Sequence, residues 1–233
     1  MLLLLIGCGP DQGLFVYPVE DAPADSAAPV DSGEPEETGE PEDTGEPEDT
    51  GEPEDTGEPE NTPRAPRAGE LVISELMINP TGVSDEAGEW VELYNAAGVG
   101  LDLSGLALGD DGVDDADVVF TQTIIAPGDL IVLCASAESN GGASCQGTYL
   151  YQTFGGGFAL SNTGDEVVLI GDDGTILDTF RYGEGFAPAG QSIGVSPSCL
   201  DADDNDAMSC WCGQSGVMTS GDAGNPGTWN DGC

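Results

Sequence analysis

The chain has 233 residues, of which 45 are Asp or Glu and 3 are Lys or Arg, so its formal net charge is −42. This charge repels nucleic-acid phosphates and anionic membrane surfaces, which excludes a nucleic-acid partner. The sequence contains no His, which excludes His-based nucleophile triads and Cys/His zinc sites. Seven Cys in an acidic, Gly-rich chain indicate an oxidising compartment.

The first eight residues form an apolar run that ends in Gly and Cys. Leu5, Ile6, Gly7 and Cys8 resemble the lipobox of bacterial lipoproteins, whose signal is cut before the Cys and whose Cys is then lipidated. The run is too short to span a bilayer. The resemblance implies a signal remnant at residues 1–7 and an anchor in the lipid bilayer through acylated Cys8. It also implies a location at the bacterial outer membrane or cell surface.

Residues 8–68 are predicted to be a disordered acidic stalk that carries the lipidated Cys. Gly33–Thr62 repeats the hexapeptides GEPEET, GEPEDT and GEPENT, and the segment has little apolar surface to bury. Each Pro favours extended geometry in the Glu before it, and the repulsion between like charges extends the chain further.

Strand-like segments begin at Gly69, where short runs rich in Val, Ile, Leu, Trp and Tyr alternate with turn residues. The segments are Gly69–Pro80, Glu89–Asn95, Leu101–Gly109, Val118–Thr121, Leu130–Cys134, Phe158–Leu160, Glu166–Ile170, Ile176–Tyr182 and Gln191–Val195. No segment with a helical period is long enough to matter. The pattern predicts an all-β fold, a β-sandwich over residues 69–195, followed by an extension at 196–233.

Six motifs in the predicted sandwich resemble, in the same order, the lamin tail domain. They are GELVISELMINP (69–80), EWVELYN (89–95), LDLSGLALGD (101–110), IAPGD (125–129), FALSNTGDEVVLI (158–170) and Ile-Leu-Asp (176–178). The closing segment Gly224–Asn230 also fits bacterial members of the family. Leu106 departs from them, because many carry an aromatic residue after Ser-Gly. The resemblance implies an immunoglobulin-like β-sandwich and supplies no catalytic residues.

Trp90 and Tyr94 are the candidate binding residues. They alternate along one strand with Glu92, while Val91 and Leu93 point to the opposite face and should meet the core. The Trp90/Tyr94 face is expected to lie under a loop, because burial is the commonest use of Trp. The alternative is an exposed aromatic surface for a sugar or a protein.

Two acidic loops are candidate Ca²⁺ sites, because Ca²⁺ prefers six to eight oxygen ligands supplied by a loop that can surround it. Their residues are Asp110, Asp111, Asp114, Asp115 and Asp117 in the first loop, and Asp201, Asp203, Asp204, Asn205 and Asp206 in the second. Neither loop has the spacing of an EF-hand. Solvated loops with Asx-turns are the favoured interpretation, and no cofactor other than Ca²⁺ is indicated.

Pairs of carboxylates, such as Glu89 with Glu92 or Glu75 with its cross-strand neighbours, are the residue types that glycosidases use. Such an activity needs two carboxyls at a set separation across a cleft, and chance pairs are certain in so acidic a chain. The sequence therefore predicts that the protein is not an enzyme, and a surface hydrolase is the unfavoured alternative.

Six cysteines remain for disulfides once Cys8 is lipidated. Cys134 ends a predicted strand, and the flexible stretch 138–144 can bring Cys145 back beside it, which favours the bond Cys134–Cys145. Residues 196–233 have few apolar side chains, so crosslinks are expected to replace burial there.

Cys210 and Cys212, one residue apart in a strand, should point to opposite faces and take different partners. This leaves Cys199–Cys210 with Cys212–Cys233, or the crossed pairing Cys199–Cys212 with Cys210–Cys233. Trp211-Cys212 followed by a Cys-terminated segment rich in Gly and Asn resembles bacterial lamin-tail proteins, which implies Cys212–Cys233.

Together these features predict a surface-exposed or periplasm-facing lipoprotein that presents a β-sandwich on a flexible stalk. Its expected role is that of a binding or structural module whose ligand is an unknown protein or glycan. Adhesion that depends on Ca²⁺ is the second hypothesis.

Overall fold

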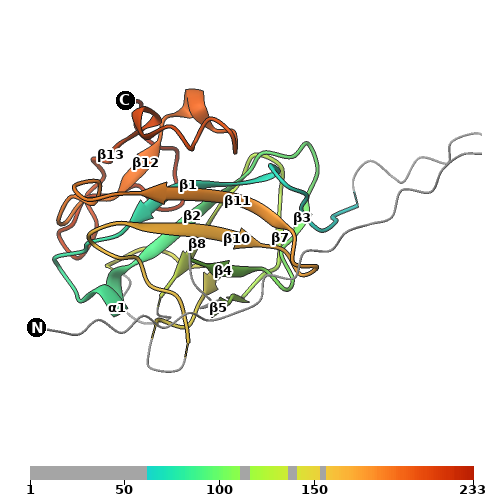
Figure 1. Ribbon diagram of the computed structural model, residues 1–233, viewed down its shortest axis with the longest axis horizontal. Coiled ribbons are helices and arrows are strands. Elements are labelled where there is room, and N and C mark those ends of the chain that lie inside the picture. The colour runs from blue at the N-terminus through green and yellow to red at the C-terminus, as the bar shows by residue number, and fades with distance from the viewer. Residues whose placement is uncertain (1–61, 111–115, 136–140, 153–155) are drawn as a thin grey trace, which may run out of the picture. The chain divides into compact units, whose positions relative to one another are not determined.

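The computed structural model describes residues 62–110, 116–135, 141–152 and 156–233, and these are mostly β-structure (Figure 1). Cys8, nearly all of the acidic repeat, and Asp111, Asp114 and Asp115 of the first acidic loop lie outside the described residues. The all-β prediction is confirmed for the part of the chain that the structure covers.

Two main sheets and one short sheet make up the described ranges. The seven-stranded sheet has the order β13 (Trp211–Gly213), β12 (Ile193–Val195), β1 (Leu71–Met77), β2 (Trp90–Asn95), β8 (Leu130–Cys134), β9 (Gly147–Thr148) and β6 (Val119–Phe120). The four-stranded sheet has the order β11 (Ile176–Tyr182), β10 (Asp165–Ile170), β4 (Ala107–Gly109) and β5 (Ala116–Asp117), and β3 (Leu101–Asp102) pairs with β7 (Ile124–Ile125). The first sheet is mixed, because β8 and β9 run parallel.

One hydrophobic core lies between the two main sheets. Leu71 and Ile73 of β1 and Val91 and Leu93 of β2 meet side chains of β10 and β11 such as Phe180. The prediction that Val91 and Leu93 face the core is therefore confirmed. Because side chains alternate along a strand, Trp90, Glu92 and Tyr94 occupy the opposite face of the same sheet.

A β-bulge at Ser74 interrupts the pairing of β1 with β2. Ile73 lies opposite Leu93, but the next partners are Glu75 and Glu92, so Ser74 is the extra residue. The bulge therefore sets two acidic residues directly opposite each other on neighbouring strands.

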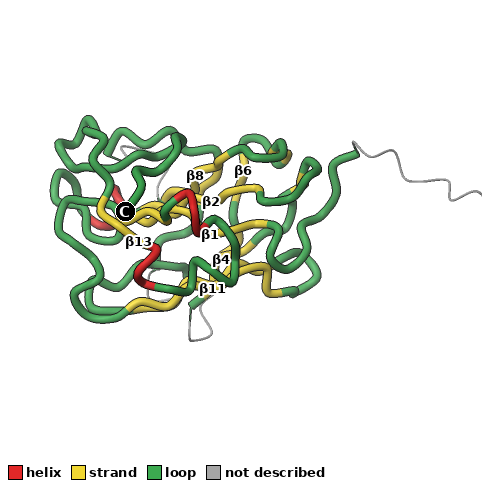
Figure 2. Tube along the Cα trace, turned by 90° about the horizontal axis from the view of Figure 1, so that it is seen from above, coloured by secondary structure: helices red, strands yellow, loops and turns green. Residues whose placement is uncertain are grey.

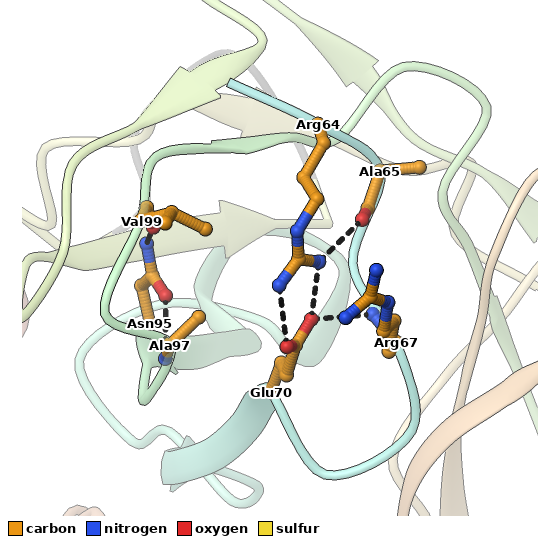
Figure 3. Close-up of polar contacts among 7 residues, drawn as sticks. All are labelled: Arg64, Ala65, Arg67, Glu70, Asn95, Ala97 and Val99. Atoms are coloured by element: carbon orange, nitrogen blue, oxygen red, sulfur yellow. Dashed lines mark hydrogen bonds and ion pairs between the residues drawn. The ribbon is translucent and has the colours of Figure 1, made fainter. Parts of the chain in front are cut away.

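The chain enters β1 through a segment that two arginines hold in place (Figure 3). The guanidinium of Arg64 donates two hydrogen bonds of 2.6 Å to the carboxylate of Glu70, and the backbone N–H of Arg67 donates a third of 2.8 Å. Nearby, Asn95 at the end of β2 donates to the carbonyl of Val99 and accepts from the N–H of Ala97. These bonds fix the described residues that lead into β1.

Loops and short helices complete the described chain (Figure 2). The helices are α1 (Asp85–Gly88) and the 3₁₀ helices η1 (Pro197–Cys199) and η2 (Met208–Cys210). None of the helices that the structure describes has the length and apolar character needed to cross a bilayer. The chain end lies beside β13 in Figure 2, which places the C-terminal residues against the seven-stranded sheet.

Some expected strands differ from the observed ones. The segment Leu101–Gly109 divides into β3 and β4 at a turn where Gly105 has φ +77° and where a Cβ would lie 2.6 Å from Asp172. Phe158–Leu160 forms only a bridge to Tyr151. The two-residue strands β7 and β9 were not expected, because strands this short carry no readable period.

Candidate functional site

The outer face of the seven-stranded sheet, which points away from the shared core, carries the main cluster of unusual side chains. It is formed by Glu75 and Met77 of β1, by Trp90, Glu92 and Tyr94 of β2, and by Val132 and Cys134 of β8. Alternation alone would leave this face in solvent. Residues 214–233, here called the C-terminal strap, cover it instead.

Glu75 and Glu92 are both fully buried beneath the strap. One carboxyl oxygen of Glu75 accepts hydrogen bonds from the hydroxyl of Ser192 and from the backbone N–H of Asn225, the latter at 2.9 Å. Glu92 accepts from the hydroxyl of Ser74 at 2.9 Å and from the backbone N–H of Gly227 at 2.6 Å. The strap is therefore bonded directly to both carboxyl groups.

Burial raises the pKa of both carboxyls above the ordinary value for Glu. Asp231 in the strap adds to the rise for Glu75, and the charge of Glu75 adds to the rise for Glu92. Glu75 Oε2 is buried and finds no hydrogen-bond partner among the described residues. Burial, like charge and this unpartnered oxygen all favour a protonated carboxyl in the pair.

Trp90 is fully buried and packs with Met77, Val132, Cys134 and Met218, the last from the strap. A Cβ on Gly224 would lie 2.8 Å from the hydroxyl oxygen of Ser192 and 3.2 Å from the Trp90 ring, so the absence of a side chain at Gly224 lets the strap approach this closely. The structure places Trp90 under a loop, as expected, and the alternative of an exposed Trp90 surface is wrong.

Tyr94, the other candidate binding residue, is half-buried and has a different aromatic partner. The Trp229 ring of the strap lies with its centroid 5.5 Å from that of Tyr94, at an interplanar angle of 56°. Trp229 is 55% exposed. The aromatic pair available to solvent is therefore Tyr94 with Trp229, and sequence analysis did not find its second member.

Glu89 lies on the other side of β2 from Glu92, so the candidate pair Glu89/Glu92 is not brought together. Its Oε2 accepts the backbone N–H of Leu160 at 2.8 Å, and its Oε1 is buried without a partner in the part of the chain described. Burial raises the pKa of Glu89 to about 8, and Asp85 and Asp165 add to this rise. Burial raises the pKa of Tyr149, and the nearby Glu89 carboxyl raises it further.

Asp178 of β11 joins the two main sheets. Its Oδ2 accepts from the N–H of Ile73 in β1 at 2.7 Å and from the side-chain amide of Asn205 at 2.8 Å, and its Oδ1 accepts from the N–H of Thr179. Burial raises the pKa of Asp178 to about 7. Asn205, a candidate Ca²⁺ ligand by sequence, is thus a buried structural residue.

The remaining acids of the second loop do not form an ion site. Asp201, Asp203 and Asp206 line a cavity of about 370 Å³ together with Asp178, while Asp204 is exposed outside it. No group of three or more Asp, Glu or Cys side chains within the described ranges is arranged to hold a metal. Asp110 and Asp117 are the only members of the first loop that the structure describes.

Three disulfides among the described residues crosslink the strap and the chain segments near it. The bonds in the described part are Cys134–Cys145, Cys199–Cys210 and Cys212–Cys233, which is the uncrossed pairing. Cys212–Cys233 ties the end of the strap to β13, and Cys134–Cys145 lies on the outer face beside Trp90. Cys199–Cys210 and Cys212–Cys233 therefore crosslink residues 196–233, a segment with few apolar side chains.

The strap residues that build this site escaped sequence analysis because Asn225, Gly227 and Trp229 lie in a Gly- and Asn-rich stretch without a period. The fit of Gly224–Asn230 to bacterial lamin-tail proteins was the signal that could have pointed to them.

Comparison with models of protein families relates the chain to a known domain. The model of the family described as Lamin Tail Domain matches residues 64–184, which begin at the Arg64 clamp and end after β11. No curated protein matches the chain.

Proposed function

Because the chain belongs to the lamin tail domain family, we propose that it is a lipid-anchored surface protein that presents an immunoglobulin-like sandwich as a non-catalytic binding module. Acylated Cys8 is the membrane anchor, the acidic repeat is the spacer, and the location is the bacterial outer membrane or cell surface. The ligand is a glycan or a protein segment that contacts the Tyr94–Trp229 pair.

The observation that carries this proposal is the half-exposed Trp229 held against Tyr94. Trp offers a large apolar face and a polar edge, so a fixed and exposed Trp suits stacking against a sugar ring or a peptide. Neighbours on both sides fix it, since Gly227 is bonded to Glu92 and the amide of Asn230 donates to the carbonyl of Ser74 at 2.8 Å. A contact residue held in place loses little further conformational entropy on binding.

The placement of the buried carboxyls supports a binding role over a hydrolase. Glu75 and Glu92 are the pair that the fold brings together, but the domain's own backbone occupies them under the strap. A glycosidase needs its two carboxyls open to a substrate. For adhesion that depends on Ca²⁺, no arrangement of the described acids offers specific support.

The test is binding by the purified chain to a glycan array and to extracted surface proteins. We expect Trp229→Ala to abolish binding to the retained ligand. Val217→Ala is the matched control, because Val217 is another exposed apolar side chain of the strap and is expected to leave binding unchanged. Equal binding by wild type and Trp229→Ala, or no ligand in either screen, would refute the proposed function.

A further inference from the structure

The strap is bonded to β1 and β2 mainly through two acids. On either side of Trp229, the N–H of Asn225 donates to Glu75, the N–H of Gly227 donates to Glu92 at 2.6 Å, and the Asn230 amide donates to the backbone of Ser74. Two of these three attachments therefore depend on the state of a carboxyl group.

The charges around these carboxyls are all negative. Glu75 and Glu92 are cross-strand partners, and Asp231 of the strap is near enough to raise the pKa of Glu75. The three arginines act on other acids of the described chain: Arg64 and Arg67 lie beside Glu70, and Arg181 pairs with Glu166. Two buried like charges without a nearby cation are strongly unfavourable, whereas one protonated carboxyl removes most of that cost.

We propose that the C-terminal strap is a pH-dependent latch, which closes when the Glu75–Glu92 pair holds a proton and opens when both carboxyls are ionised. Closure places Trp229 beside Tyr94, so opening separates the two aromatic rings. The latch itself stands on the buried acids, and only its effect on ligand binding rests on the proposed function.

Opening is limited to a defined loop. Cys212–Cys233 holds the strap end at β13, and β13 itself pairs with β12. The first half of the strap also stays attached, because the Asp222 carboxylate accepts hydrogen bonds from the N–H groups of Thr81 and Gly82, and the N–H of Ser192 donates to the carbonyl of Ala223. The part that lifts is therefore residues 224–230, and the sheet stays intact. Ionisation strengthens the hydrogen bonds from Asn225 and Gly227, but two backbone donors cannot match the water that two carboxylates would gain.

The direction of the response follows from the raised pKa values. A carboxyl whose pKa is higher in the closed state than in the open state binds its proton preferentially when closed. The closed state is therefore favoured at low pH and weakens as pH rises through the raised values. At pH values where the closed state holds the proton and the open state does not, the equilibrium constant for opening rises about tenfold for each pH unit.

Amide hydrogen exchange of Asn225 and Gly227 in the full chain tests the latch. After correction for intrinsic exchange, we expect the protection of both amides to fall at least about tenfold from about pH 6 to about pH 9. In Glu75→Gln with Glu92→Gln the fall should vanish, because neither side chain can ionise. Glu89→Gln is the matched control, because Glu89 is a buried Glu that accepts its hydrogen bond from Leu160 and not from the strap, and its replacement should leave the fall in place.

The outcomes separate the latch from the binding function. Protection that is constant with pH in the wild-type chain overturns the latch, whatever the variants do and whether or not a ligand binds. Protection that falls while Trp229→Ala still binds ligand supports the latch and overturns the proposed function. Protection and ligand binding that are lost together as pH rises support both.

Discussion

Glu89→Gln should flatten the dependence of stability on pH. The pKa of Glu89 rises from an ordinary 4.5 to about 8 in the folded state, mainly by burial. The stabilisation from its proton is complete below the unfolded value and is lost as pH rises toward the folded value. At 1.36 kcal/mol for each pKa unit, the full loss is on the order of 5 kcal/mol. Gln keeps an acceptor for the N–H of Leu160 and places its amide at the oxygen that has no recorded partner.

Denaturant unfolding with intact disulfides, at about pH 5 and about pH 9, measures this effect. Wild type should be more stable at the lower pH, and Glu89→Gln should lose the share of that difference that comes from Glu89 while matching wild type at the lower pH. Asp178, Glu75 and Glu92 contribute slopes of the same sign, because burial also raises their pKa, so the comparison with the variant isolates Glu89. Wild-type stability that rises from the lower to the higher pH, or a variant with the full wild-type slope, would show that Glu89 is not protonated in the fold.

Three further changes test other parts of the molecule. Asp178→Ala should lower the free energy of unfolding by about 2–5 kcal/mol, because it leaves the buried N–H of Ile73 without its acceptor and removes one of the two acceptors of the Asn205 amide. The exposed Asp172→Ala should change it little. Deletion of residues 33–62 removes no apolar core, and calorimetry should find the melting temperature within about 2 °C of wild type. Cys8→Ser, expressed with a functional upstream signal, should move the protein from the membrane fraction to the soluble fraction, and retention after a high-salt wash would contradict the anchor.

The strands that sequence analysis placed well are those whose apolar side chains repeat over several residues. β1, β2, β8, β10 and β11 each have five or more residues and face the shared core on one side. The period-2 pattern of Val91 and Leu93 therefore predicted the inward face correctly. In β3, β7 and β9 two residues cannot show a period, and only pairing with distant chain segments defines them.

The candidate site was harder to predict because alternation gives the direction of a side chain but not what covers it. Trp90, Glu92 and Tyr94 were placed together on one face, and the structure agrees. The burial of Glu92 depends on Gly227, which lies 135 residues away in sequence. No local pattern encodes that contact, so the same reasoning could not show that Glu75 and Glu92 face each other in a closed, acidic environment.

The strap gives this chain properties that residues 64–184 cannot supply alone. The family match ends before β12, β13 and the strap, yet the recorded donors to Glu75 are Ser192 and Asn225, both beyond the match. Without those later residues the Glu75 carboxyl would lie on an open sheet face, where water would keep its pKa near the ordinary value for Glu. Trp229 also comes from the later segment, while its partner Tyr94 belongs to the matched domain. The raised pKa of Glu75 and the exposed aromatic pair therefore have one origin. Residues that follow the family match cover the outer face of β1 and β2, which lie within the match.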